Sequence, residues 1–293
     1  MINELKQYIS ENNIGGCQTQ YIPGQALVEQ AESRLKTKFG PQLREYLLTY
    51  GWLSYEGVSL HGLTMATGLG SDLISGTESA RKDTRYLNDY VVIYYEEGWS
   101  YIAVDSDDNV YEWLLSCLWY DEPPRSLGKK LNEYIIDRLE EEKEIVKRFN
   151  EQSAFEDYVK THISLLPDSE RAAESVLCRA KKILGMEYNF DVECYLREYS
   201  LISYGNVHLC GLLKALGDYP NIVVETIKMR QKYPQTENLV TIEVLENEKY
   251  VVTDDDGKIL IFDGEKGEAY PTHKSFSKYY LERFEEEQKR MEK

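Results

Sequence analysis

Hydrophobic residues in the first part of the chain recur at helical spacing. The set is Leu27, Val28, Ala31, Leu35 and Phe39. Intervals of three and four predict an amphipathic helix that ends before Gly40. Pro41 suits the first turn of a following helix, and Gly51 stands where that helix is expected to end. The chain therefore opens with consecutive helices.

Segments with strand character come later. They are predicted at residues 90–95, 99–104 and 110–114, and are rich in β-branched and aromatic residues. Turns are expected at 96–98 and 105–109, and across the turn-rich stretch 54–76. A helix through 131–139 closes the pattern. Helices followed by a meander of strands are typical of an α+β fold, with an antiparallel sheet packed against helices.

The same order of patterns occurs twice. A shift of 149 residues superimposes Ala31, Tyr46, Leu63, Arg81 and Ile93 on Ala180, Tyr195, Leu212, Arg230 and Ile242. The closing helix repeats at a shift of 145, which places Arg138 on Arg283. A period this long is a domain and not a solenoid unit. We therefore expect two tandem modules, residues 1–149 and 150–293, joined by a charged helical connector.

Charge distinguishes between kinds of partner. The 293 residues carry a formal net charge of −17, and both halves are acidic: residues 1–150 hold 15 basic and 24 acidic residues, the remainder 19 and 27. Such a field repels nucleic acid and anionic membranes and speeds encounter with a basic partner. An acidic surface that only keeps the protein soluble is the alternative interpretation.

Five cysteines, odd in number and without a C-x-x-C pair, favour a reducing compartment. The N-terminal residues lack the features of a signal peptide, and no apolar run is long enough for a membrane span. A cytoplasmic location is expected.

Candidate catalytic and metal-binding residues do not form a recognisable constellation. His61, His162, His208 and His273 are scattered and lack the i, i+4 spacing of a helical metal site. The Asp-rich turns at 105–109 and 254–257 lack the bidentate glutamate of a calcium loop, so plain turns are favoured. No catalytic, cofactor-binding or metal-binding residue is predicted.

Several segments together resemble the SUKH (Smi/Knr-type) superfamily. They are Ala31–Leu35, Phe39–Pro41, Tyr46–Leu48, Tyr50–Gly51, Asp89–Ile93 and Val110–Trp113. Their order and spacing carry the resemblance, which covers residues 1–145 and, more weakly, 150–293. The first copy has Gly40–Pro41 in place of a Leu-Pro pair. The second copy has Asn189–Phe190 there and lacks a glycine after Tyr199.

The resemblance implies a binding protein and not an enzyme. Bacterial members are mostly immunity proteins that neutralise toxin domains, often nucleases, by occlusion and without a cofactor. A cognate toxin domain with a basic surface is then the expected partner. The alternative is an intracellular scaffold or regulatory module of the same superfamily. An enzyme acting on small molecules is a third and less favoured class.

Two segments of the first copy combine aromatic side chains with carboxylates. The expected contact residues are Glu96, Glu97 and Trp99 in the first segment, and Trp119, Tyr120, Asp121 and Glu122 in the second. Aromatic anchors and steering charges are the usual components of an interface with a basic partner. Trp99 aligns with Glu248, so it is expected to be exposed. Trp52 and Trp113 align with Leu201 and Phe262 and are expected in the core. Packing of Trp99 on the sheet or against the second domain is the alternative.

Overall fold

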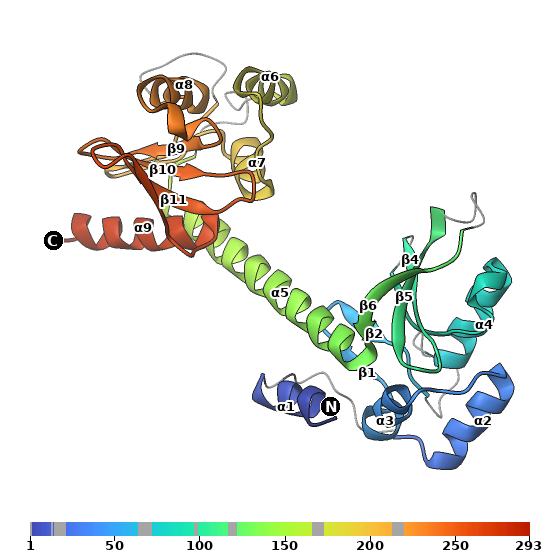
Figure 1. Ribbon diagram of the computed structural model, residues 1–293. Coiled ribbons are helices and arrows are strands. Elements are labelled where there is room, and N and C mark those ends of the chain that lie inside the picture. Colours follow the sequence, from blue (N-terminus) through green and yellow to red (C-terminus); the bar gives the residue numbers. More distant parts are fainter. Residues whose placement is uncertain are drawn as a thin grey trace. The chain divides into compact units, whose positions relative to one another are not determined.

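The computed structural model of the protein describes residues 2–12, 14, 22–63, 72–96, 99–116, 122–165, 173–212 and 220–293. The chain divides into two compact units, residues 1–146 and 147–293 (Figure 1), called here the first and the second unit. No helix within the described ranges is both long and apolar enough to cross a membrane.

The first unit begins with helices and continues with a sheet. Its elements are α1 (Ile2–Glu11), α2 (Gln25–Leu35), α3 (Pro41–Tyr50), β1 (Leu53–Tyr55), β2 (Val58–Leu60), α4 (Leu73–Asp83), β3 (Val91–Glu96), β4 (Ser100–Val104), β5 (Asn109–Leu114), β6 (Arg125–Lys130) and the start of α5 (Leu131–His162). The strands β3-β4-β5-β6 form an antiparallel meander, and β1 pairs with β2 as a small hairpin.

The second unit repeats this order from the last part of α5. It contains α6 (Glu174–Leu184), α7 (Phe190–Glu198), β7 (Ser203–Tyr204), β8 (Val207–His208), α8 (Ile222–Lys232), β9 (Val240–Val244), β10 (Lys249–Thr253), β11 (Ile259–Asp263), β12 (Glu268–Pro271) and α9 (Phe276–Met291). Its sheet order is β12-β11-β10-β9, again antiparallel. The α+β fold in two modules is therefore confirmed.

Each sheet is covered on both faces. In the first unit, Leu43 and Leu47 of α3 and Ile135 of α5 share a core with Ile93 and Ile102 of the sheet. A smaller cluster on the opposite face joins Ala80 of α4 to Trp113 and its neighbours. The second unit has the same two clusters. In the first unit the sheet therefore lies between α4 and the other helices, and in the second unit it lies between α8 and the other helices.

Equivalent hydrogen bonds from backbone N–H groups to side chains confirm the shift of 149. Thr77 Oγ1 accepts the N–H of Val92 at 3.0 Å, and Thr226 Oγ1 accepts the N–H of Thr241 at 3.0 Å. The shift of 145 is confirmed in the closing helices, where Glu142 accepts the N–H of Gly57 at 3.0 Å and Glu287 that of Asn206 at 2.7 Å. The two sequence repeats are thus two copies of one hydrogen-bonding scheme.

One arginine in each unit fastens three elements together. Arg81 of α4 donates to the carbonyls of Leu35 at 2.6 Å and Tyr90 at 2.9 Å, which belong to α2 and the approach to β3. Arg230 of α8 donates in the same way to Leu184 at 2.8 Å and Leu239 at 3.2 Å. The match of these arginines in the sequence therefore reflects a shared structural role.

Several expectations need correction. The stretch 54–76, expected to hold turns, contains the hairpin β1-β2 and the first residues of α4, and α4 and α8 were not predicted. Strands β6 and β12 were also missed, because their residues are mostly exposed and show no alternating burial. Ser200 of the second unit stands at the position that Gly51 takes in the first. Its φ is +57°, close to the +70° of Gly51.

Candidate functional site

The described residues of the two predicted contact segments lie at one end of the first sheet. The N–H of Trp99 donates to the carbonyl of Glu96 at 2.9 Å, and the N–H of Leu115 donates to the carbonyl of Trp99 at 2.8 Å. The indole N–H of Trp113 donates to the backbone carbonyl of Glu122 at 3.0 Å. Because residues 113 and 115 both lie at the end of β5, Glu96, Trp99 and Glu122 share one end of the sheet. The other predicted contact residues, Glu97, Trp119, Tyr120 and Asp121, lie outside the described residues.

This end of the sheet exposes apolar side chains. Trp99 is 73% exposed, Leu114 40% and Tyr95 38%. Leu114 is the cross-strand partner of Ser100, directly after Trp99, and Tyr95 is the partner of Tyr101. The sequence did not predict Tyr95 and Leu114 as exposed, since strand alternation alone does not show which side chains the rest of the fold leaves uncovered. We call Tyr95, Glu96, Trp99, Leu114 and Glu122 the hairpin end.

A row of aromatic rings supports the hairpin end from the α4 face. The ring centroids of Tyr95 and Tyr101 are 5.1 Å apart, and Tyr101 stacks on Trp113 at 6.1 Å. The hydroxyl of Tyr101 donates to Asp83 at 2.6 Å. Desolvation by burial, together with this bond, raises the pKa of Tyr101, so the hydroxyl stays protonated and holds α4 to the sheet. The exposed residues therefore sit on an ordered scaffold.

The tryptophans differ in burial. Trp113 is 1% exposed and belongs to the smaller core cluster, as expected. Trp99 is exposed, also as expected from its alignment with Glu248. Trp52 is only half-buried, which corrects its assignment to the core.

The second unit has a different surface at the equivalent end. Glu248 takes the position of Trp99, since its carbonyl accepts the N–H of Gly264 at 2.9 Å just as that of Trp99 accepts Leu115. Its carboxylate pairs with Lys232 at 2.6 Å and accepts from the hydroxyl of Tyr233 at 2.5 Å. Hydrogen bonds to Lys232 and Tyr233 lower the pKa of Glu248. An exposed aromatic anchor at this place is thus a feature of the first unit.

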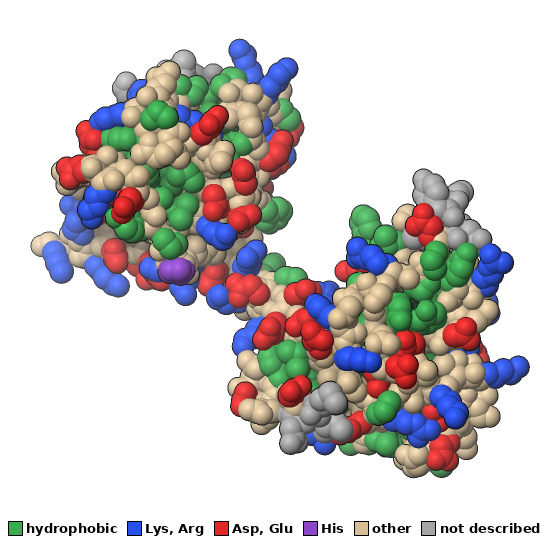
Figure 2. Space-filling model, in the orientation of Figure 1, with side chains coloured by type: hydrophobic (Ala, Val, Ile, Leu, Met, Phe, Trp, Pro, Cys, Tyr) green, Lys and Arg blue, Asp and Glu red, His purple; other side chains and the backbone are tan. Residues whose placement is uncertain are grey.

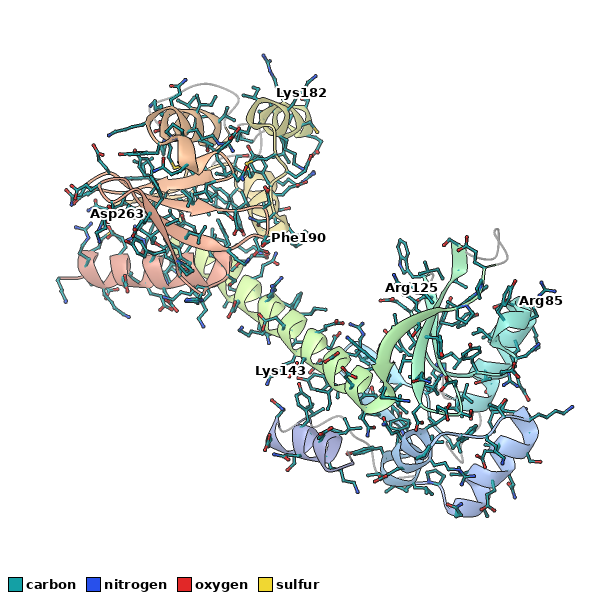
Figure 3. The ribbon with its side chains drawn as sticks, in the orientation of Figure 1. Arg85, Arg125, Lys143, Lys182, Phe190 and Asp263 are labelled. Carbon is teal, nitrogen blue, oxygen red and sulfur yellow. The ribbon has the colours of Figure 1, made fainter. Side chains whose placement is uncertain are left out.

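Acidic and basic side chains are interspersed on the face of the molecule that Figure 2 shows, and the chain as a whole has a formal net charge of −17. At the described part of the hairpin end, Glu96 and Glu122 are both exposed. The nearby ion pair of Arg125 with Glu112, at 2.5 Å, leaves Arg125 71% exposed (Figure 3). Aromatic area beside carboxylates suits contact with a basic protein surface.

The Asp-rich turn after β4 is held by its own hydrogen bonds. Asp105 Oδ1 accepts the N–H groups of Asp107 and Asn109, each at 2.9 Å. Asp108 turns inward and caps α3 through the N–H groups of Gln42 and Leu43. Within the described ranges, no group of three His, Cys, Asp or Glu residues is placed to hold a metal ion.

A shallow pocket occurs at the same place in both units. In the first it is lined by Leu5, Lys6, Gln42, Glu45, Tyr46, Thr49, Tyr50 and Asn132. In the second, Asp191 and Cys194 take the positions of Gln42 and Glu45. Desolvation, followed by the charges of Asp191 and Glu193, raises the pKa of Cys194, so the thiol stays protonated and is a poor nucleophile.

Comparison with known proteins gives one family match, which covers most of the chain. A family model described as "SMI1-KNR4 cell-wall" (SUKH_5) matches residues 1–120 and 133–285. A solved structure titled "Crystal structure of protein from Pseudomonas syringae pv. tomato" is 14% identical, with a TM-score of 0.33. That alignment covers 44% of this chain and 94% of the other. A search of curated proteins found no match.

Proposed function

The chain belongs to the SUKH (SMI1-KNR4) family, and from this premise we propose that it is an immunity-type protein that binds a cognate toxin domain. It neutralises the toxin by covering the surface that the toxin needs for activity. The toxin is basic, as nucleases that bind phosphate backbones are. Capture uses no cofactor, because occlusion requires contact and not chemistry.

The exposed Trp99 is the observation that carries this proposal. A tryptophan that is 73% exposed offers large contact area at low entropic cost. Glu96 and Glu122 are exposed at the same end of the sheet, and Glu97 and Asp121 adjoin them in sequence. The first unit therefore makes the contact, and the net charge of −17 speeds the encounter.

The second candidate is an intracellular scaffold or regulator that holds a cellular protein with the same hairpin end. The description of the matching family refers to the cell wall, which favours this candidate. Genomic position separates the two. A neighbouring gene for a large secreted protein with a variable C-terminal domain supports immunity, and its absence favours the scaffold.

Binding kinetics with the toxin domain from such a neighbouring gene test the site. Trp99→Ala should stay folded and lose about 30-fold or more in affinity, mainly through faster dissociation. Asp121→Lys/Glu122→Lys should slow association instead, and this loss should shrink at high salt.

Glu248→Ala, at the position equivalent to Trp99, is the matched control and should bind like the parent. If the Trp99 and charge-swap variants both bind as tightly as the parent, the contact surface lies elsewhere in the molecule. If the parent itself does not bind or inhibit the toxin, the immunity proposal is wrong.

A further inference from the structure

Two neighbouring helices of the second unit expose aliphatic side chains to water. Ile183 on α6 is 53% exposed, and Val224 and Ile227 on α8 are 39% and 36% exposed. The helices are directly connected, because Arg230 of α8 donates to the carbonyl of Leu184 on α6 at 2.8 Å. We call the outward side of these two helices the α6–α8 face.

The first unit shows that the fold does not require this apolar surface. A shift of 149 places Ile183 on Arg34 and Ile227 on Glu78. In the first unit these two residues form a bidentate ion pair, with both contacts at 2.8 Å. The second unit thus has two exposed isoleucines where the same fold accommodates an ion pair. Exposed aliphatic area gives an isolated unit no stability, so a partner that covers it accounts for the difference.

The charges around the isoleucines have also changed. Gln30, Ser33, Ser79 and Asp83 of the first unit correspond to Arg179, Lys182, Lys228 and Lys232 of the second. Helices α6 and α8 together carry six basic and two acidic residues, a net of +4, whereas α2 and α4 carry three basic and four acidic residues. The two helices are thus basic in a chain of net charge −17, although Lys181 and Arg230 bond to their own unit.

Two of the three basic side chains of α6, Arg179 and Lys182, are exposed, whereas Lys181 pairs with Glu193 of its own unit at 2.6 Å. Figure 3 shows Lys182 projecting from α6 into solvent, and both Lys182 and Arg179 are exposed. Neither has an ion-pair partner among the described residues, whereas Lys228 pairs with Glu225 at 2.8 Å and Lys232 with Glu248 at 2.6 Å. At least two positive charges beside the isoleucines are therefore available to an acidic ligand.

We propose that the α6–α8 face is a second docking surface, which binds an acidic amphipathic helix of a partner protein. The isoleucines and Val224 receive the apolar stripe of that helix, and Arg179 and Lys182 pair with its carboxylates. This surface is separate from the hairpin end, and its partner has the opposite charge to the proposed toxin.

The charges argue against two other occupants of the α6–α8 face, a second copy of the chain and a membrane. Pairing of two α6–α8 faces would bring basic side chains of two chains together. An anionic bilayer would meet the basic face but would be repelled by the remainder of a strongly acidic protein. The exposed apolar residues are β-branched aliphatics, without the tryptophan or tyrosine that favours a membrane interface.

Fluorescence anisotropy with labelled helical peptides tests the proposal on the full-length protein. The probe carries leucines at positions i, i+3, i+4 and i+7 and glutamates at the other exposed positions, and a second peptide replaces glutamate by lysine. The acidic peptide should bind, and its affinity should fall with added salt. The basic peptide should bind at least ~10-fold more weakly.

Variants that restore residues of the first unit locate the binding. Ile183→Arg/Ile227→Glu should keep the fold, since the equivalent ion pair exists in the first unit. It should lower the affinity for the acidic peptide at least ~10-fold. Arg179→Gln/Lys182→Ser should reduce affinity and its salt dependence. Arg34→Ile/Glu78→Ile on the first unit is the control and should bind like the parent. Toxin binding should be unchanged by the variants of the second unit, which separates this test from that of the immunity function.

Three results would overturn the proposal: no binding of the acidic peptide, equal binding of both peptides, or undiminished binding to Ile183→Arg/Ile227→Glu. Binding to anionic vesicles that this variant abolishes would assign the face to a membrane. Self-association that the variant abolishes, seen by sedimentation, would assign it to a second copy of the chain.

Discussion

The carboxylate of Asp108 lies over Gly40 and caps the start of α3. It accepts the N–H of Gln42 at 2.8 Å and of Leu43 at 3.0 Å, and a Cβ built on Gly40 would collide with it. In the second unit the two roles are exchanged. Asn189 stands at the position of Gly40 and caps its own helix through the N–H of Val192 at 3.1 Å, while Gly257 replaces Asp108. Asn189, which departs from the family pattern, is thus matched by a second change, Gly257 in place of Asp108, and the helix keeps a cap.

This exchange predicts a coupled pair of substitutions. Asp108→Gly should destabilise the first unit by about 1–2 kcal/mol, because α3 loses its cap. Gly40→Asn alone should also destabilise it, through collision with Asp108. The double variant, which reproduces Asn189 and Gly257, should recover at least about 1 kcal/mol relative to the sum of the single effects. Tryptophan fluorescence in urea measures this selectively, since all four tryptophans lie in the first unit. Strict additivity would contradict the exchange.

An ion pair is reversed between the units in the same way. Glu32 accepts from Arg44 Nε at 3.1 Å and from the N–H of Phe39 at 2.7 Å, and the equivalent residues Lys181 and Glu193 pair at 2.6 Å. Glu32→Lys or Arg44→Glu alone should cost about 2–3 kcal/mol, because each places like charges together in a partly buried site.

The double variant Glu32→Lys/Arg44→Glu should recover more than half of the summed loss. Urea unfolding followed by tryptophan fluorescence measures all three variants. Arg34→Gln, which breaks an exposed pair nearby, is the control and should change stability by less than about 1 kcal/mol. A double variant no better than its single parents would show that this site does not tolerate reversal.

We expect the second unit to lose stability in acid because of Glu287. Hydrogen bonds from Arg290 and then from the backbone of Asn206 lower its pKa from 4.5 to about 2. A depressed carboxyl pKa in the folded state contributes stability above the unfolded value, and that stability is lost as the pH falls through the folded value. The parent should therefore lose stability between pH 4.5 and about 2 more steeply than Glu287→Gln. Thermal melts by circular dichroism across this range measure the difference, with the exposed Glu286→Gln as control. Parallel profiles for parent and Glu287→Gln would exclude this role.

Separate fragments test the proposed division into residues 1–149 and 150–293. Each contains its own sheet and both of its hydrophobic clusters. Each should therefore unfold cooperatively in urea, although the cut lies within α5. If neither fragment, nor a mixture of the two, unfolds cooperatively, the two parts do not fold as independent domains.

The sequence by itself determined the repeat, the α+β order and most elements with a strong hydrophobic period. Helix α3, from Pro41 to Tyr50, agrees with prediction because its apolar spacing, first-turn proline and following glycine all act locally. Helix α4 was missed because its buried residues include only Leu73, Thr77 and Ala80, and because it contains Gly76. That glycine is needed by the tertiary structure, since a Cβ there would lie 2.7 Å from the ring of His61.

The candidate site likewise combines features that the sequence predicts with features that only the folded structure decides. Exposure of Trp99 followed from its alignment with Glu248, a comparison within the sequence. The hydrogen bond from Trp113 to Glu122 and the exposure of Tyr95, Leu114, Ile183 and Ile227 depend on which residues meet or are covered in the folded chain. Local periodicity sets where helices and strands form. Burial, capping and ion pairing across distant residues are decided only when the chain packs, because each depends on a partner whose position the local sequence does not specify.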